Sequence, residues 1–371
     1  MKKIAVIAPY PFLPAGSGGQ KLIDSFTRFL GAASSLLVIG TDNNLIPESK
    51  PYTFLPLLNK HKWRYTNPFL IKKLTRPLKK NQTEILILEH PYFGWIIPFL
   101  RTIKGIKIIC HTHNVESLRF RSLGKFWWRL LYIYEKWVLK NCDQVWCITE
   151  EDQSFFTGTM KIPVERCSIL PYGIDLQHAP ADKTEARETV CRHHDLDTNL
   201  PLLFFNGVLD YKPNQEALNI ILDEILPRLK KKNFPFYLIV AGKNLPQTYQ
   251  ELRNYRDSGV VYAGFVNNID LYTKAADLLL NPVISGGGIK TKMIEALAMN
   301  TGVVSTKSGA AGVDPVYCGE KLKLAADRDW DTFTNLILET VQDKNSSTPN
   351  AFYDHFNWGK IIQRMLQQLP Q

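Results

Sequence analysis

The sequence predicts an α/β protein made of two doubly wound, Rossmann-like domains, and two observations lead to this prediction. Short apolar and β-branched runs alternate with helical patterns through both halves of the chain, which is typical of parallel sheets covered by helices on both faces. The chain also has 371 residues, more than a single hydrophobic core usually serves. Sheets of this type bind ligands beyond the carboxyl ends of their strands, so we expect the two domains to face a central cleft.

The expected elements are short and regularly spaced. In the first half the expected strands cover residues 3–8, 35–40, 84–88, 106–110 and 144–148. In the second half they cover residues 201–206, 235–241, 260–262, 277–280 and 302–305. The helices expected between them include residues 20–30, 124–140, 214–230, 293–298 and 329–341.

A polar stretch divides the two halves. Residues 178–199 are rich in charge and have the weakest secondary-structure pattern of the chain. We therefore expect an N-terminal domain over residues 1–178, a linker over 179–199 and a C-terminal domain over 200–348. The last residues, 349–371, are aromatic-rich and then amphipathic, which predicts a C-terminal helix that either caps the second domain or crosses back to brace the first.

Composition excludes several classes of protein. Hydrophobic residues make up 45% of the chain and charged residues 22%, which is typical of globular proteins and excludes disorder as the main state. No apolar run reaches the length of a membrane span, and prolines interrupt the apolar start after Ala8, so that start is interpreted as a first strand and the protein as cytoplasmic. The six cysteines form no Cys-x-x-Cys pair, which argues against zinc ligation and disulfides.

The most informative stretch covers residues 281–298, where an apolar run, three glycines at 286–288 and a helical segment follow one another. Backbone N–H groups and a helix dipole converge on an anion in such an arrangement, which predicts a phosphate site. Lys290 and Lys292 add positive charge there, whereas Glu295 would repel phosphate and suits a ribose hydroxyl. The segment therefore predicts a nucleotide diphosphate; the alternative is a glycine turn before an ordinary core helix.

Five pieces of sequence, in this order, resemble the retaining GT-B-fold glycosyltransferases of family 4. They are the glycine loop at residues 11–19, the segment His111–Glu116, the pair 143–149 and 169–175, the loop at 205–214, and the segment 261–266 followed by the triple glycine. The resemblance covers nearly the whole chain. It implies a GT-B fold, a nucleotide-diphosphate sugar as donor, a glycan or lipid-linked acceptor and no resident metal or other cofactor.

The resemblance also implies roles for individual residues. The expected donor-binding residues are Gly207, Lys212, Phe265, Gly286, Gly287, Gly288, Lys290, Lys292 and Glu295. His113 is the expected catalytic residue, facing the donor sugar near the reacting carbon; the alternative is a histidine that caps a strand end. Gly18 and Gly19 open a helix and are expected to meet a phosphate or a sugar hydroxyl; the alternative is a tight turn that needs positive φ.

The remaining candidates carry open alternatives. Phe265 is expected near the nucleotide base; the alternative is a core aromatic. Asn214 is expected first as a helix N-terminal residue and second as a ligand contact. His111 is expected to pack more deeply than His113 on the same side of the strand. Glu89 and Glu116 are weak candidates for a catalytic acid or base.

Two positions depart from the family pattern. Gly287 stands where the family often has the first of two glutamates, the second being Glu295. Val208 stands where a basic residue is common, so the diphosphate has to rely on Lys290, Lys292 and Lys212.

Positive charge is concentrated in the first half of the chain. Residues 1–180 hold 24 Lys and Arg against 13 Asp and Glu, whereas the remainder holds 21 against 22. Aromatic residues lie among these cations over residues 61–80 and 119–137, as at a membrane headgroup layer. We therefore expect an anionic membrane surface as a partner of a peripheral protein, the alternative being a solvated basic face. No nucleic-acid-binding motif accompanies the charge.

Together these observations predict a metal-independent, retaining glycosyltransferase that transfers a sugar from a nucleotide-diphosphate sugar to an acceptor hydroxyl in bacterial envelope polysaccharide or glycolipid synthesis. The alternatives are a non-catalytic nucleotide-sugar-binding protein and a sugar-nucleotide epimerase, which shares the two-domain architecture.

Overall fold

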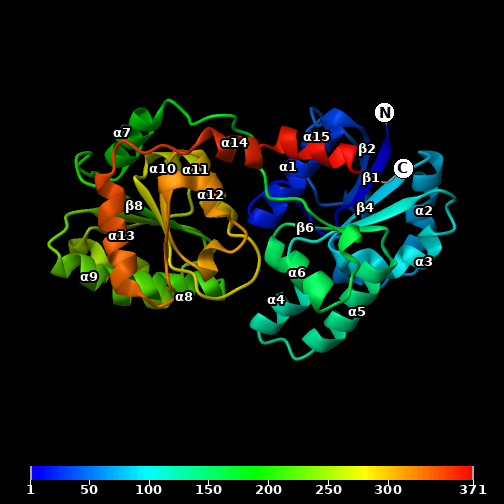
Figure 1. Ribbon diagram of the computed structural model, residues 1–371, viewed down its shortest axis with the longest axis horizontal. Helices are drawn as coiled ribbons and strands as arrows, with labels where there is room; N and C mark the ends of the chain where they lie inside the picture. The colour runs from blue at the N-terminus through cyan, green and yellow to red at the C-terminus, as the bar shows by residue number, and fades with distance from the viewer. Residues whose placement is uncertain (1, 370–371) are drawn as a thin grey trace. The chain divides into compact units, whose positions relative to one another are not determined.

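The structure is a computed structural model that describes residues 2–369 (Figure 1). Its contacts divide the chain into two compact units. The first unit contains residues 1–175, 287–289 and 356–371, and the second contains residues 176–286 and 290–355. Residues 1, 370 and 371, which belong to the predicted first domain and C-terminal helix, lie outside the described residues.

The first unit is built on a seven-stranded parallel sheet with the order β3-β2-β1-β4-β5-β6-β7. Its strands are β1 Lys3–Ile7, β2 Ser35–Thr41, β3 Thr53–Leu58, β4 Ile85–Glu89, β5 Lys107–His111, β6 Gln144–Cys147 and β7 Cys167–Ile169. The central strands are apolar without alternation, and every residue of β4 is buried, as expected where helices cover both faces. The strand order reverses between β1 and β4, which creates a switch point at their carboxyl ends.

The second unit is built on a six-stranded parallel sheet with the order β10-β9-β8-β11-β12-β13. Its strands are β8 Leu202–Asn206, β9 Tyr237–Ala241, β10 Val260–Gly264, β11 Leu278–Asn281, β12 Gly302–Thr306 and β13 Leu322–Ala325. Here the order reverses between β8 and β11. The predicted doubly wound α/β class is therefore confirmed for both halves.

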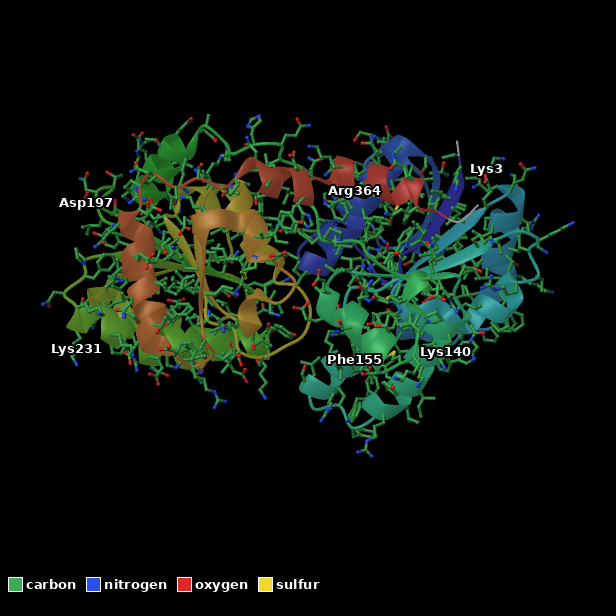
Figure 2. All side chains as sticks on the ribbon, in the orientation of Figure 1. Lys3, Lys140, Phe155, Asp197, Lys231 and Arg364 are labelled. Atoms are coloured by element: carbon green, nitrogen blue, oxygen red, sulfur yellow. The ribbon has the colours of Figure 1, made fainter. Side chains whose placement is uncertain are left out.

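Helices of both units pack an apolar stripe against their sheet. The α-helices of the first unit are α1 Gly18–Ala33, α2 Leu70–Lys80, α3 Ile97–Leu100, α4 Glu116–Ser122, α5 Trp128–Asn141, α6 Glu150–Gly158 and α15 Trp358–Gln367. Those of the second are α7 Lys183–His193, α8 Lys212–Ile220, α9 Leu226–Lys231, α10 Ile269–Ala275, α11 Thr291–Ala298, α12 Pro315–Cys318, α13 Trp330–Gln342 and α14 Asn350–Phe356. The last residue of α14, Phe356, already belongs to the first unit. In α1, for example, Leu22, Phe26 and Leu30 are buried at helical spacing. Charged side chains such as Lys231, at the end of α9, are exposed at the surface (Figure 2).

Two predicted elements need correction. Residues 179–199, expected as a linker, contain α7, because Ala186, Val190 and Cys191 give this otherwise polar segment a small buried face. The helix expected over residues 214–230 begins at Lys212 and is interrupted by a π-helical turn at 221–225.

The last helix is fixed to the first unit. Trp358 is 1% exposed, and its ring lies 6.3 Å from the ring of Phe26 in α1 and 6.2 Å from that of Tyr172. Gly173 has to be glycine, because a Cβ there would come within 2.5 Å of the Trp358 indole. A β-bridge between Ile174 and Asn357 completes the attachment of α15.

Candidate active site

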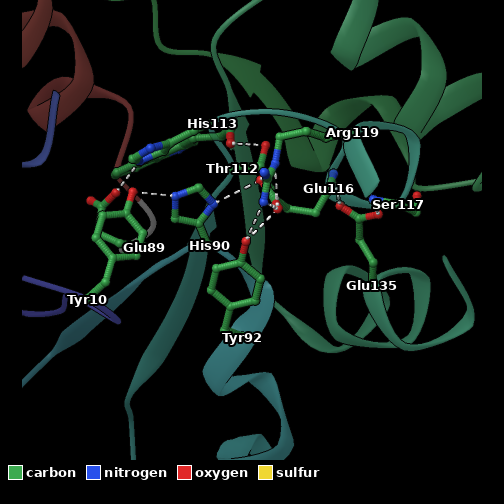
Figure 3. Close-up of polar contacts among 11 residues, drawn as sticks. Tyr10, Glu89, His90, Tyr92, Thr112, His113, Glu116, Ser117, Arg119 and Glu135 are labelled. Atoms are coloured by element: carbon green, nitrogen blue, oxygen red, sulfur yellow. Dashed lines mark hydrogen bonds and ion pairs between the residues drawn. The ribbon is translucent and has the colours of Figure 1, made fainter. Parts of the chain in front are cut away.

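In the first unit, polar side chains gather at the carboxyl ends of three neighbouring strands. Tyr10 follows β1, His90 directly follows β4, and His113 follows β5 by two residues. These strands flank the switch point of the sheet, where doubly wound proteins bind ligands. The rings of His90 and His113 lie with centroids 4.0 Å apart, and Tyr10 is within hydrogen-bonding distance of His90 (Figure 3).

A buried carboxylate holds the predicted catalytic histidine. Glu89 contacts His113 Nε2 through Oε2 at 2.6 Å and His111 Nδ1 through Oε1 at 3.1 Å. Although burial opposes ionisation, the two histidines hold the pKa of Glu89 well below its usual range. Burial and the nearby His90 lower the pKa of His113 to about 3, so its ring is neutral at physiological pH.

These contacts fix the tautomer of His113. An ionised carboxylate accepts hydrogen bonds and donates none, so Nε2 of the neutral ring carries the proton and donates a hydrogen bond to Glu89. Nδ1 is then a hydrogen-bond acceptor, and it is buried without a partner among the described residues. A Cβ on Gly19 would lie 4.0 Å from this atom, which places the start of α1 beside it.

The glycines at the start of α1 do not form the alternative tight turn. Positive φ is absent at both Gly18 and Gly19, which begin α1 in ordinary backbone conformation after the extended Ser17. At Gly19 the reason for glycine is space, because a Cβ would come within 3.1 Å of the Tyr10 hydroxyl.

A second buried polar group lies next to the first. Glu116, fully buried at the start of α4, accepts hydrogen bonds from the Tyr92 hydroxyl at 2.5 Å and from Arg119 at 2.6 Å. His90 Nδ1 approaches it to 3.4 Å. These partners hold the pKa of Glu116 well below its usual range in spite of burial. The Glu135 carboxylate of α5 accepts hydrogen bonds from the backbone N–H groups of Glu116 and Ser117, which fixes the first turn of α4.

His90 has an unusual backbone for a residue with a side chain. Its φ of 65° and ψ of 162° lie in a region that glycine almost alone occupies, and such a conformation costs on the order of 1–3 kcal/mol. The backbone N–H of His90 nevertheless donates a hydrogen bond to the backbone carbonyl of His111 at 2.9 Å, which extends the pairing of β4 with β5. Strain of this kind concentrates at functional sites.

The three residues Glu89, His111 and His113 also have the donor set of a divalent-metal site. Their candidate ligand atoms all lie within 4.8 Å of one another. In this geometry, however, both carboxylate oxygens of Glu89 are engaged by the imidazoles, which is the arrangement of a hydrogen-bonded cluster. The absence of a resident metal stays a prediction.

In the second unit, Gly207 follows β8 and Gly286 comes after β11, the two strands that flank the switch point, whereas Phe265 follows the edge strand β10. Lys292, in the first turn of α11, reaches the end of β8, where its Nζ donates to the Asn206 carbonyl at 3.2 Å and lies 4.6 Å from the Phe205 ring centroid. Burial and the neighbouring Lys290 lower the pKa of Lys292 to about 7. The Oδ1 atom of Asn206 is buried without a partner among the described residues.

The triple-glycine segment requires glycine at two of its three positions. Gly286 and Gly288 have φ of 83° and 75°, which side chains rarely adopt, whereas a Cβ on Gly287 would meet nothing within 4 Å. Lys290 Nζ donates to the Gly286 carbonyl at 3.1 Å and so lies on the loop side of α11. Glu295 follows in the same helix, half-buried.

The other donor candidates differ in exposure. Gly207 packs against Asn214, whose side chain donates to the Val208 carbonyl at 3.0 Å, so Asn214 holds the loop after β8. Lys212 begins α8 with its side chain 70% exposed, 3.8 Å from Glu216. Phe265 is 69% exposed after β10, so the alternative of a core aromatic is wrong.

Comparison with known proteins agrees with the fold and the predicted family. The family model of glycosyl transferases group 1 matches residues 201–343, and that of glycosyltransferase family 4 matches residues 28–178. The chain is a group 1 glycosyltransferase of the family 4 type. An uncharacterized glycosyltransferase of Methanocaldococcus jannaschii is 22% identical to it, with 98% of this chain and 97% of the relative covered.

Solved glycosyltransferases share the fold over their whole length. The sucrose-phosphate synthase of Thermosynechococcus elongatus aligns with a TM-score of 0.76 and 18% identity, over 99% of this chain and 98% of that protein. HepE of Anabaena, solved in complex with UDP, aligns with a TM-score of 0.72 and 14% identity, over 98% of each chain. Within the described residues, the glycosyltransferase has no helix that is long and apolar enough to cross a membrane.

Several polar residues of the glycosyltransferase were missed or undervalued by sequence reasoning. Tyr10 and His90 were not singled out, and Glu89 was given little weight as an acid or base. The sequence places Glu89 at the end of a predicted strand, but only the pairing of β4 with β5 brings it next to His111 and His113. The strained backbone of His90 leaves no mark in the sequence.

Proposed function

We propose that this glycosyltransferase transfers a sugar from a nucleotide-diphosphate sugar to an acceptor hydroxyl with retention of anomeric configuration. The observation that carries the donor class is the pair Lys290 and Lys292 beside the glycine segment at a strand switch point, which concentrates cations where phosphates bind. HepE has been solved with UDP-glucose as well as UDP, which supports the same donor class.

The chemistry needs little from the protein beyond binding and charge. The donor diphosphate binds at Lys290 and Lys292, which stabilise the negative charge that develops as the sugar–phosphate bond breaks. In a front-face mechanism, the departing diphosphate takes the proton of the incoming hydroxyl. No residue is then required as a covalent nucleophile, and the lysines supply the charge stabilisation.

His113 contributes a hydrogen-bond acceptor. Its neutral ring, held by Glu89 with the proton on Nε2, presents Nδ1 to a sugar hydroxyl. A charged imidazolium would offer only donors at this point. The carboxylate of Glu89 thus decides which kind of hydrogen bond His113 makes.

We further propose that the acceptor is a glycan or lipid-linked glycan at an anionic membrane surface. Solved neighbours include the lipopolysaccharide galactosyltransferase WaaB, and a relative comes from the cps region of Klebsiella pneumoniae. On α5 the apolar side chains Leu130, Ile133 and Trp137 share one face and are 70%, 64% and 40% exposed, with Phe126 before them 92% exposed. The opposite face of α5 is buried.

Basic residues border this apolar face on one side. Lys125, Arg129, Lys136 and Lys140 lie on α5 or just before it, and Lys140 at its end is exposed (Figure 2). α4 and α5 pack side by side in the first unit (Figure 1). An exposed apolar stripe bordered by cations is the composition of a helix that lies in the headgroup layer.

A panel of nucleotide diphosphates and their sugars, screened by thermal shift, tests the donor class. A ligand at 100 times its dissociation constant should stabilise the protein by about 2.7 kcal/mol. The donor found in this way is then incubated with membrane glycolipid extracts, and the product is examined by NMR. A product of inverted anomeric configuration would contradict the proposed retention, and the absence of any nucleotide-dependent shift would contradict the donor class.

A further inference from the structure

Tyr10, His90 and Glu116 form a chain of polar contacts that the proposed chemistry does not use. The Tyr10 hydroxyl lies 2.9 Å from Nε2 of His90, and Nδ1 of the same ring lies 3.4 Å from Oε1 of Glu116 (Figure 3). Tyr92 stacks on the His90 ring with centroids 5.2 Å apart and fixes its plane. His90 and Glu116 are both buried, whereas Tyr10 is half-buried.

Charge decides where the protons of this chain lie. Arg119 and His90 keep Glu116 ionised, because they hold its pKa well below the usual range. Nδ1 of His90 faces this carboxylate, so Nε2 is the ring nitrogen that can accept a hydrogen bond from the Tyr10 hydroxyl. Burial and the charge of Glu89 raise the pKa of Tyr10 far above its usual range, so the phenol stays protonated.

As a result, Tyr10 presents an oxygen lone pair. It does so beside Gly19, where a Cβ would lie 3.1 Å from the Tyr10 hydroxyl and 4.0 Å from His113 Nδ1. The Tyr10 oxygen and His113 Nδ1 thus both lie next to Gly19 at the start of α1. Two hydrogen-bond acceptors suit a ligand whose hydroxyl groups donate hydrogen bonds. They disfavour a phosphate or a carboxylate at this point, because ionised oxygens can only accept.

We propose that Tyr10 accepts a hydrogen bond from a hydroxyl of the transferred sugar, next to the one that His113 accepts, and that His90 is the residue that positions Tyr10. This inference rests on the proposed glycosyltransferase reaction. It explains why a histidine occupies a backbone conformation that glycine would adopt freely, since only the side chain at position 90 can connect Tyr10 to Glu116.

The test measures the sugar-dependent part of donor affinity. Calorimetry compares UDP with UDP-glucose, and GDP with GDP-mannose, for the wild-type protein and for Tyr10→Phe, which keeps the ring and removes the oxygen. Loss of one hydrogen bond should weaken binding of the nucleotide sugar about two- to tenfold and leave the affinity for the nucleotide diphosphate unchanged. Tyr132→Phe is the matched control, because its hydroxyl bonds only weakly, at 3.5 Å to Thr159, away from these strand ends.

His90→Gly and the double variant Tyr10→Phe/His90→Gly test the positioning role. His90→Gly should reduce the sugar-dependent affinity as much as Tyr10→Phe does, and the double variant should be no weaker than either single variant. Additive losses would overturn the role of His90, and unchanged sugar affinity in Tyr10→Phe would overturn the contact itself. Equal loss of UDP and UDP-glucose binding would mark Tyr10 as merely structural. Wild-type protein that binds none of these nucleotides would instead overturn the proposed donor class and this inference with it.

Discussion

The two units of this glycosyltransferase carry polar sites of opposite character. In the first unit, the polar side chains are buried, contact one another and have defined proton positions, as in the Glu89–His113 pair. In the second, Lys290 and Lys292 contact the backbone carbonyls of Gly286 and Asn206. The first site is thus organised before any ligand binds, whereas the second places two lysines beside backbone carbonyls.

The outer surfaces of the two units also differ, in charge and in exposed apolar side chains. The first half of the chain carries the excess of positive charge, and α5 exposes apolar side chains, whereas the second half is nearly neutral. In the function proposed above, the first unit would recognise sugar hydroxyls and an anionic surface, and the second unit would recognise the diphosphate.

The largest effect is expected from the preorganised site. His113→Ala should lower the rate of sugar transfer about a hundredfold or more, because a group oriented toward the reacting sugar is lost. Nucleotide diphosphate affinity should not change, since His113 belongs to the first unit. Steady-state kinetics and calorimetry measure the two quantities, and His193→Ala, at an exposed histidine of α7, is the control.

Glu89→Gln sharpens this prediction. An amide can donate to His113 and reverse its tautomer, so transfer should fall at least about tenfold while the ring remains. If Glu89→Gln transfers sugar at the wild-type rate, the tautomer of His113 does not matter and the first site is not organised as described.

A smaller effect is expected from the cations of the second unit. Lys290→Ala and Lys292→Met should each weaken binding of a nucleotide diphosphate about tenfold, because hydrogen bonds to charged groups contribute about 1.5–3 kcal/mol. Calorimetry with UDP and GDP measures this, and Lys231→Ala at the exposed end of α9 serves as the control. If both variants bind the nucleotide diphosphate with wild-type affinity, the glycine segment is only a turn before a core helix and not a phosphate site.

The pH dependence of binding should follow Lys292. Its pKa of about 7 means that the free protein carries this charge below pH 7 and loses it as the pH rises. A bound diphosphate favours the charged form, so nucleotide affinity should fall as the pH rises above 7, by up to about tenfold per pH unit. Binding at pH 8 should take up a proton, which calorimetry in buffers of different ionisation enthalpy detects. Lys292→Met should take up none, and equal uptake by both proteins would assign the proton elsewhere.

The smallest effect per residue is expected at the membrane surface. Each Lys or Arg near an anionic bilayer contributes about 1 kcal/mol, screened beyond about 8 Å at physiological salt. Sedimentation with anionic liposomes should therefore be salt-sensitive and decrease when Lys72, Lys73, Lys79 and Lys80, all exposed on α2, become Glu. Leu130→Ser and Ile133→Ser should weaken the salt-resistant part of binding. If the protein does not bind anionic liposomes even at low salt, the basic residues form only a solvated surface, and a soluble acceptor is favoured.

The sequence by itself determined the elements whose pattern is local. The central strands are continuous apolar runs buried on both faces, and their positions agree with prediction to within a few residues. β3, β7 and β13 were missed because strands at the edge of a sheet are less buried, so their side chains carry a weaker pattern. The order of strand, glycine loop and helix around residues 286–288 was also readable, since β11 and α11 lie where the sequence predicts them; phosphate binding there stays a prediction.

Tertiary structure alone decided the chemistry of the first unit. Tyr10, Glu89, His90, His113 and Glu116 are separated along the chain, and only the parallel order β1-β4-β5 brings the ends of their strands together. The proton positions on His113 and His90 depend on which carboxylate each ring faces, and the pKa of Lys292 depends on its burial beside Phe205. Residue type and spacing specify which groups can titrate or donate, but the distance between charges and their removal from water arise only when the chain is folded.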